Sequence, residues 1–456
     1  MKKILLYLTL FFCGTIYSQT PHLEGTINLD IEKGLVHCNF KLSKIENNKS
    51  FSVLINRGFN VKYFKLNNQV LDVARKPNYN SVEYDIYRAN SIDSDLPLTS
   101  LENIEVEYNG AFPVFNGTER NDGDDMGNIA IKDGIIRATV QSNFIPELRD
   151  RISNKRITSF TFNITVNSET KTTVYLNGCV PKSGKNLKFQ SEKPFDFLIY
   201  AGIYKVKHNE NLYLLNSNLE DKYVEVLAEN VKKISDYYSK SMGIGYDENV
   251  VFPQIFSVGP PNQYRKWAFT VTPTIVMDVN ELNTKIDLRS RTITDTNTFR
   301  IIAHEMAHKY FMQQLNANGT KNLWRFYHET LAQYLAFKAV ENLISESAYQ
   351  KTLTDYTFTK ENKEATFKTF EEIDNSDVDL TRASYDYYPL YLIGFEKMFG
   401  IEKTYKLLKQ LVVDKNEFTF DTEYFKKRSI GTGISKIEFE KYAEDYLNSK
   451  NCTNKF

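Results

Sequence analysis

Hydrophobic and polar residues alternate along the first part of the chain, from about residue 22 to residue 206. A period of two places successive side chains on opposite faces of a strand, so these segments are predicted to be half-buried β-strands. Turn-forming residues at 78–80 and 121–125 separate them. The clearest runs are Ile27, Leu29, Ile31, then Ile104, Val106, Tyr108, then Phe160, Phe162, Ile164, Val166. The pattern predicts an antiparallel β domain over residues 19–206.

The hydrophobic period lengthens beyond residue 206. Apolar residues then recur every three or four positions, which predicts an amphipathic helix that ends near Gly243 and Gly245. A strand-like segment at 267–278 follows, and helical patterns dominate from there to the C-terminus. Because 456 residues exceed what one core usually organises, we expect a second, mostly helical domain over residues 207–456 and an α+β fold overall.

The first residues differ from the rest of the chain. Two lysines precede an apolar run of fourteen residues at 4–17, which is the layout of a secretory signal and predicts removal of residues 1–18. The run is shorter than the roughly twenty residues that span a bilayer. A lipid anchor on Cys13 is the minor alternative, because the bulky Phe12 stands where such sites favour small residues. We expect a secreted or periplasmic protein whose mature chain has no membrane span.

Charge and cysteine content exclude some partners and leave other questions open. Lys plus Arg and Asp plus Glu both number 57, so the net charge is zero and we expect no nucleic-acid partner. Without the signal segment three cysteines remain, Cys38, Cys179 and Cys452, and none has a metal-binding spacing. A Cys38–Cys179 disulfide and buried free thiols are both open alternatives. The sequence does not determine the oligomeric state.

The segment His304-Glu305-Met306-Ala307-His308 carries the clearest chemical signal. It lies in a helix-compatible run at 299–315, which residues 295–297 can cap and residues 316–319 can end. A separation of four residues stacks both imidazoles on one helix face, where they can bind one tetrahedral zinc ion. Glu305 is turned aside from that row, so it is placed to act as a general base on a metal-bound water.

A third ligand is needed, and Glu329 is the candidate. It begins the apolar, helix-like segment 329–336, and two histidines with one carboxylate are a usual donor set of catalytic zinc. His328 beside it is the competing ligand, since imidazole also binds zinc well. The other histidines lie in the β domain or at its edge and have no metal-ligand spacing: His22, His37 and His208. We therefore predict one zinc ion per chain, held by His304, His308 and Glu329.

These residues resemble the gluzincin peptidases, and in particular the M1 aminopeptidase family. That family has eighteen residues between its His-Glu-x-x-His motif and the glutamate ligand, whereas this chain has the twenty residues 309–328. The excess falls in a connection between helices, where an insertion costs little closure entropy. The resemblance implies a saddle-like N-terminal β domain, a thermolysin-like (gluzincin) catalytic domain, and zinc-dependent hydrolysis of peptide bonds in peptide or protein substrates.

A second likeness to this family lies downstream, at 385–400. Tyr385 leads into a predicted helix that ends at Phe399-Gly400, which is similar to the family's Tyr-x-Lys-Gly segment and the helix after it. The family's tyrosine donates a hydrogen bond to the tetrahedral intermediate, so the resemblance implies oxyanion stabilisation by Tyr385. Tyr387 and Tyr388 are close enough in sequence to be alternatives.

The third motif of the family, Gly-Ala-Met-Glu-Asn, is absent. Its counterpart in this chain is the segment Ala268-Phe269-Thr270, so the resemblance implies that these residues bind substrate. Thr270 then stands where the family's glutamate holds the α-amine of the substrate, and a hydroxyl cannot neutralise an ammonium group. An endopeptidase, or a peptidase of altered end specificity, is therefore the alternative to an aminopeptidase. The rival outside enzymes is a catalytically idle peptide-binding protein.

Overall fold

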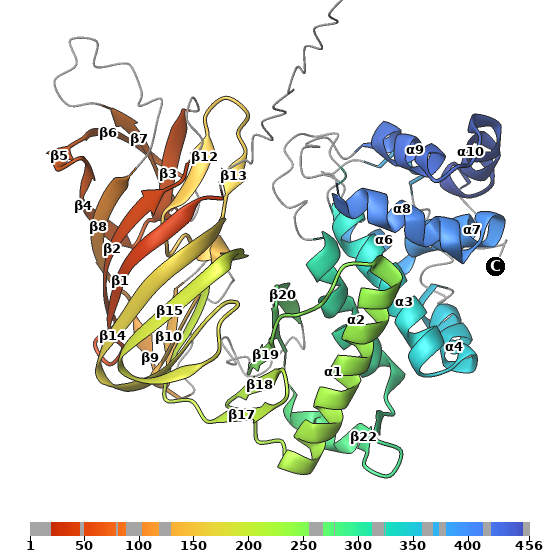
Figure 1. Cartoon of the computed structure of the whole chain (residues 1–456), viewed down its shortest axis with the longest axis horizontal. Helices are drawn as coiled ribbons and strands as arrows, with labels where there is room; N and C mark the ends of the chain where they lie inside the picture. Colours follow the sequence, from red (N-terminus) through yellow and green to blue (C-terminus); the bar gives the residue numbers. More distant parts are fainter. Residues whose placement is uncertain are drawn as a thin grey trace, which may run out of the picture.

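The structure is a computed structural model that describes most of the chain. A β-rich N-terminal part and a largely helical C-terminal part lie side by side in Figure 1, which confirms the predicted α+β fold class. The described residues are 20–45, 50–78, 81–87, 103–117, 129–254, 268–277, 279–311, 323, 325–357, 368–373, 380–413 and 421–449. Several sequence predictions concern residues outside these ranges: the signal segment 1–18, the turn at 121–125, the helix end at 312–319, and Cys452.

The N-terminal part is built on an 11-stranded sheet in the order β5-β4-β8-β2-β1-β14-β16-β11-β10-β9, with β15 paired to β14. Most neighbours are antiparallel, as predicted, but β1 pairs with β14 in parallel, and so does β9 with β10. The strands are β1 (His22–Asp30), β2 (Leu35–Ser43), β4 (Phe59–Leu66), β5 (Gln69–Val70), β8 (Ile104–Ala111), β9 (Val114–Phe115), β10 (Ala130–Lys132), β11 (Ile135–Thr139), β14 (Ser159–Leu176), β15 (Lys182–Asp196) and β16 (Leu198–Gly202).

A second sheet packs against the first and completes the core of this part. Its order is β13-β12-β3-β7-β6, and all its pairs are antiparallel. The alternating residues that predicted strands supply the core: Ile27, Val106 and Tyr108 are fully buried. The strands are β3 (Phe51–Asn56), β6 (Asp72–Pro77), β7 (Ser81–Tyr87), β12 (Glu147–Asp150) and β13 (Arg156–Ile157), and a 3-10 turn, η1 (Val140–Ser142), precedes β12.

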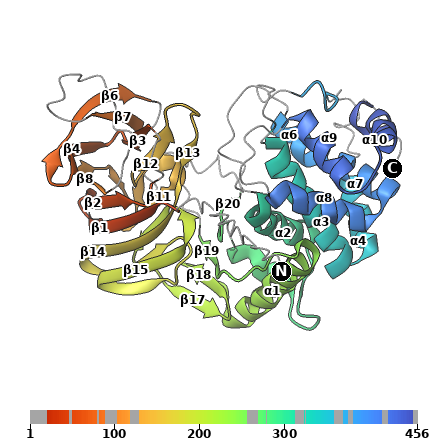
Figure 2. The same ribbon diagram turned by 45° about the horizontal axis from the view of Figure 1, so that its top comes forward.

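A smaller, mixed sheet lies between the two parts in both views (Figures 1 and 2). Its order is β17-β18-β19-β21-β20, with β18–β19 and β19–β21 parallel. The segment predicted as one strand at 267–278 is a hairpin, because β20 and β21 pair antiparallel, and β20 is the last strand of this sheet. The strands are β17 (Val206–Asn209), β18 (Leu212–Leu215), β19 (Val250–Pro253), β20 (Phe269–Val271) and β21 (Thr274–Val276).

The helices that follow form one extensive core with this sheet. The first predicted helix is α1, which ends as expected at Gly243, where a φ of 65° suits glycine. The helices are α1 (Asp221–Met242), α2 (Thr296–Phe311), α3 (Leu331–Leu343), α4 (Glu346–Thr357), α6 (Leu380–Asp386), α7 (Pro389–Phe399), α8 (Ile401–Val413), α9 (Thr422–Gly431) and α10 (Lys436–Tyr442). Shorter elements are η3 (Asn280–Thr284), β22 (Ile286–Asp287), β23 (Thr292–Ile293) and the π-helical turns η5 (Phe326–Thr330) and η6 (Ala443–Leu447).

Buried polar contacts fix the β20–β21 hairpin to the N-terminal part. The amide of Asn177, just beyond β14, donates to the carbonyl of Thr272 at 2.9 Å and accepts from the Thr274 hydroxyl at 2.7 Å. The Tyr175 hydroxyl lies 2.5 Å from the Thr274 hydroxyl. A small apolar cluster, which includes Val271, covers these contacts. The N-terminal part therefore determines where the hairpin lies.

The described residues answer the question that the sequence left open about the cysteines. Cys38 is buried, Cys179 is partly buried, and both are free thiols, so they do not form the disulfide that the sequence left open. Within the described residues, no helix is both long enough and apolar enough to cross a bilayer.

Candidate metal centre and active site

Helix α2 carries the two motif histidines in the middle of the core. The side chain of Asp295 accepts a hydrogen bond from the backbone N–H of Thr298 at 2.7 Å, which confirms the predicted start of the helix. His304 and His308 are one turn apart, with ring centroids 4.7 Å from each other, and each is only 4% exposed. Two nearly buried imidazoles on one helix face are thereby directed into one small volume.

Glu329 reaches the same volume from the turn η5, immediately before α3. Its Oε2 lies 3.2 Å from Nε2 of His304 and 3.6 Å from Nε2 of His308. One ligand atom from each of the three residues lies within 4.8 Å of the others. Helix α2 and the turn before α3 are thus arranged so that the three predicted ligands converge.

The electrostatics of the three residues suit a metal ion. Burial lowers the pKa of His308 well below its ordinary value, so the ring is neutral at pH 7 and offers a lone pair. Burial opposes ionisation of Glu329, but its contacts with His308 and His304 outweigh burial and hold its pKa below the usual range. Two imidazoles and one carboxylate, with room for a further ligand, are the donor set of catalytic zinc sites. The residues present therefore fit zinc.

His328, the competing ligand, lies beside this group. Its ring stacks on that of His308 with centroids 4.0 Å apart. Its Nε2 lies 3.8 Å from Glu329 Oε1, whereas His304 contacts the other carboxylate oxygen, Oε2. The convergent group in the described residues contains Glu329 and leaves His328 out. The geometry favours the ligand set predicted from the sequence.

Glu305 is buried beside the histidines and contacts the β20–β21 hairpin. It is 7% exposed, and burial raises its pKa. The hydroxyl of Thr270, on β20, donates to Oε2 of Glu305 at 2.7 Å. The structure thus brings the predicted base and the predicted substrate strand together. Of the other two residues in that segment, Ala268 packs against the helical core and Phe269 begins β20.

The three candidate tyrosines differ in position. The ring of Tyr385, on α6, lies 5.4 Å from the ring of His304 and is partly exposed. Tyr387 is buried, and its hydroxyl donates to the carbonyl of Ser449 at 3.0 Å. Tyr388 is buried against Phe326. Of the three candidates, Tyr385 is therefore the tyrosine that the fold places beside the predicted ligand histidines.

Two buried contacts between elements hold this arrangement, and neither was among the sequence predictions. Arg300 donates to Gln333 at 3.0 Å and so ties α2 to α3. The hydroxyl of Thr330 donates to the carbonyl of Ser384 at 3.1 Å. The contact between Arg300 and Gln333 had a sequence signal. Arg300 lies four residues before His304, and Gln333 lies four after Glu329, so each shares a helix face with a predicted ligand.

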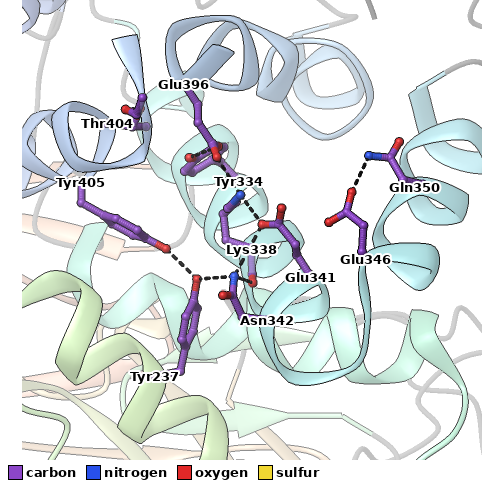
Figure 3. Close-up of polar contacts among 11 residues, drawn as sticks. Tyr237, Tyr334, Lys338, Glu341, Asn342, Glu346, Gln350, Glu396, Thr404 and Tyr405 are labelled. Carbon is purple, nitrogen blue, oxygen red and sulfur yellow. Dashed lines mark hydrogen bonds and ion pairs between the residues drawn. The ribbon is translucent and has the colours of Figure 1, made fainter. Parts of the chain in front are cut away.

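A partly buried ion network connects α3 to α7. Lys338 forms ion pairs with Glu341 on its own helix and with Glu396 on α7, the latter at 2.8 Å (Figure 3). Tyr334 donates to Glu396 at 2.6 Å. Asn342, also on α3, donates a hydrogen bond from its side-chain amide to the hydroxyl of Tyr237 on α1 at 3.1 Å. The helix that follows Glu329 is thereby fixed to the helix that follows Tyr385.

Comparison with known proteins identifies the fold. No protein-family model matches the chain. Yeast leukotriene A4 hydrolase in complex with bestatin is similar over 95% of this chain and 66% of its own, with 13% identity and a TM-score of 0.60. An M1 zinc metallopeptidase mutant from Deinococcus radiodurans, bound to a Tyr-Ser-Ala substrate, is similar over 95% of this chain and 91% of its own, with 14% identity and a TM-score of 0.59.

At these identities the likeness establishes the fold, and the chain spans about two thirds of the yeast protein's length. The class of fold is that of a gluzincin metallopeptidase, with a β domain before a helical domain. More particularly, the chain has the aminopeptidase-like fold of the M1 zinc metallopeptidases, as its motifs implied.

Proposed function

We propose that this protein is a zinc-dependent peptidase. The observation that carries the proposal is the convergence of His304, His308 and Glu329 within 4.8 Å, in a chain with the M1 metallopeptidase fold. Glu305 is buried next to this group, where a general base is required. A protein that only binds peptides has no need of a buried base beside a metal-binding group, which argues against the idle-binder alternative.

The residues around the metal group divide the reaction between them. Zinc bound there would supply Lewis-acid activation of water and of the scissile carbonyl. Glu305 takes the proton of the attacking water and returns it to the leaving amine. Tyr385, beside His304, donates a hydrogen bond to the oxyanion.

Strand β20 supports binding of an extended substrate. It ends the five-strand order, with β21 as its strand neighbour among the described residues, so it is an edge strand of this sheet. Such an edge offers backbone N–H and C=O groups to a peptide strand. Because β20 also contacts α2, a peptide on this edge would lie next to the catalytic groups.

The end specificity follows from Thr270. Its hydroxyl is neutral and is already donated to Glu305, so it does not provide the anion that an α-ammonium group requires. The finer proposal is a peptidase that accepts blocked or internal peptide bonds. We also propose export, because the lysines and the apolar run at 4–17 have the layout of a secretory signal.

Metal analysis combined with one variant tests the central proposal. Protein purified in the presence of zinc should contain one zinc ion per chain and hydrolyse peptides. Glu305→Gln should keep the zinc and lose about a hundredfold or more of the turnover rate, because it removes the base and spares the ligands. Glu346→Gln, in the first turn of α4, is the matched control and should change neither property. Wild-type protein without zinc, or full activity in Glu305→Gln, would contradict the assignment.

A further inference from the structure

The hydroxyl of Thr270 has two oxygens of the same residue within reach. It lies 2.7 Å from Glu305 Oε2 and 3.2 Å from the Glu305 backbone carbonyl. A hydroxyl carries one proton, and the closer, ionisable oxygen is the stronger acceptor. Threonine is branched at Cβ, so its side chain has few rotamers and the strand backbone largely fixes the direction of the hydroxyl. Thr270 therefore presents a donor of defined direction to the carboxylate.

Glu305 depends on such a donor more than the metal ligands do. His304 and His308 are rings on a helix, with two side-chain torsions each, whereas Glu305 has three torsions and ends in a group that can rotate. It is 7% exposed, so water has little access to hold it. A buried carboxylate that loses its hydrogen-bond donor pays a desolvation cost or moves to another position.

The position of this donor is set from outside the helical part. Thr270 lies on β20, which pairs with β21, and Asn177 and Tyr175 of the N-terminal part hold the turn and start of β21. The histidines are placed by α2, on which Glu305 also lies. Helix α2 therefore fixes the backbone of Glu305. The hairpin, which the N-terminal part holds, fixes its carboxylate.

We propose that Thr270 is a positioning residue for Glu305: its hydroxyl orients the carboxylate for proton transfer from the attacking water, and it does not serve as a substrate contact. The kinetic consequences rest on the peptidase function proposed above. The hydrogen bond itself does not, so it can be tested separately.

The kinetic experiment compares two substitutions in the zinc-loaded enzyme. Thr270→Val keeps the shape and removes the hydroxyl, and Thr270→Ser keeps the hydroxyl. We expect Thr270→Val to lower kcat by roughly ten- to a hundredfold, with KM and zinc content within about twofold, since misplacing a catalytic group by about 1 Å costs that much. Thr270→Ser should stay within about threefold of wild type. Equal kcat in wild type and Thr270→Val, or equal losses in Val and Ser, would overturn the proposal.

A matched control tests the substitution itself. The control is Thr165→Val on strand β14. Thr165 is also partly buried, and it is distant from α2 in the sequence. It should leave kcat, KM and zinc content unchanged. A fall in kcat as large as that of Thr270→Val would show that any Thr-to-Val change in a strand has this effect, and the proposal would be wrong.

A second experiment does not use activity. Thermal unfolding of the metal-free protein is measured for Thr270→Val, Glu305→Leu and the double variant. We expect Thr270→Val to lower the melting temperature by roughly 1–3 °C in the wild-type background, and to have no such effect when Glu305 is already Leu. Additive shifts would refute the contact. If wild type hydrolyses no peptide while the shifts are non-additive, the proposed function fails and the positioning contact stands.

Discussion

The ion network behind α3 offers a direct test of how the site is supported. Lys338→Met removes the cation and retains an unbranched apolar stem, so the change acts mainly on charge. The Lys338 side chain is 5% exposed, while those of Glu341 and Glu396 are 23% and 21% exposed. Burial alone would lower the pKa of Lys338, but hydrogen bonds to both glutamates outweigh it and the pKa is raised. The ammonium is therefore charged throughout the neutral range.

The expected loss can be bounded from this exposure. Removing one partner of a fully buried ion pair costs about 3–5 kcal/mol, because the remaining charge is left uncompensated. Here both carboxylates retain access to water, so we reduce the expected loss of unfolding free energy to about 2–3 kcal/mol. Burial raises the pKa of Glu341, which is harder to ionise in the folded state. Without Lys338 the pKa of Glu341 rises further in the folded state, so ionising Glu341 costs the folded variant more. The loss of unfolding free energy should therefore grow as the pH rises from about 4 to 7.5.

Urea unfolding followed by circular dichroism at 222 nm reports on the helical part and gives the midpoint and slope. Lys338→Met should lower the urea midpoint without changing the slope. The midpoint should fall less at pH 4 than at pH 7.5. The matched control is Lys232→Met on α1, where the lysine is 58% exposed and pairs with Asp236, and it should cost less than about 0.5 kcal/mol. A loss in Lys338→Met no larger than in the control, or one independent of pH, would refute the reasoning.

Three further outcomes are expected. Tyr385→Phe should lower kcat by about two orders of magnitude with zinc retained, while Tyr387→Phe should not; the reverse result would show that Tyr387 is the oxyanion donor. Because Thr270 offers no anion, free and N-acetylated forms of one peptide should have similar kcat/KM; a hundredfold preference for the free amine, about 2.7 kcal/mol, would contradict this. N-terminal sequencing of exported protein should find a start near Gln19, and a cytoplasmic chain retaining Met1 would exclude the signal.

The parts of the site that the sequence predicts are local. His304 and His308 lie on one face because a helix has a fixed repeat, and their helix is recognisable from its cap and its apolar run. Glu329 follows after a connection between helices. It lies in the turn η5, directly before α3, and this placement brings it into the same volume although the connection is longer than in the family pattern. The strands of the N-terminal part were predictable for the same reason, since alternation is a property of consecutive residues.

The pairings that the sequence does not reveal join distant residues. The parallel pair β1–β14 aligns His22 with Thr161, and alternation along each strand says nothing of which partner or direction it takes. The contact between Thr270 and Glu305 likewise depends on where a hairpin packs. The hairpin did leave a signal: Pro273 lies within the segment predicted as one strand, and proline cannot donate to a ladder there.

The proposed catalytic groups and the predicted metal ligands are held by different contacts, so metal binding and turnover can be tested separately. Arg300 and Gln333 join the helix of the histidines to the helix after Glu329, so this contact governs the geometry of the ligands. Thr330 reaches the backbone next to Tyr385, and Thr270 reaches the base. Among the hydrogen bonds of the described residues, neither hydroxyl contacts a predicted metal ligand, so under the proposed mechanism each supports a group that is needed only when substrate reacts. The resemblance implies that Thr270 replaces a glutamate of the M1 pattern, and its hydroxyl here contacts the proposed base instead.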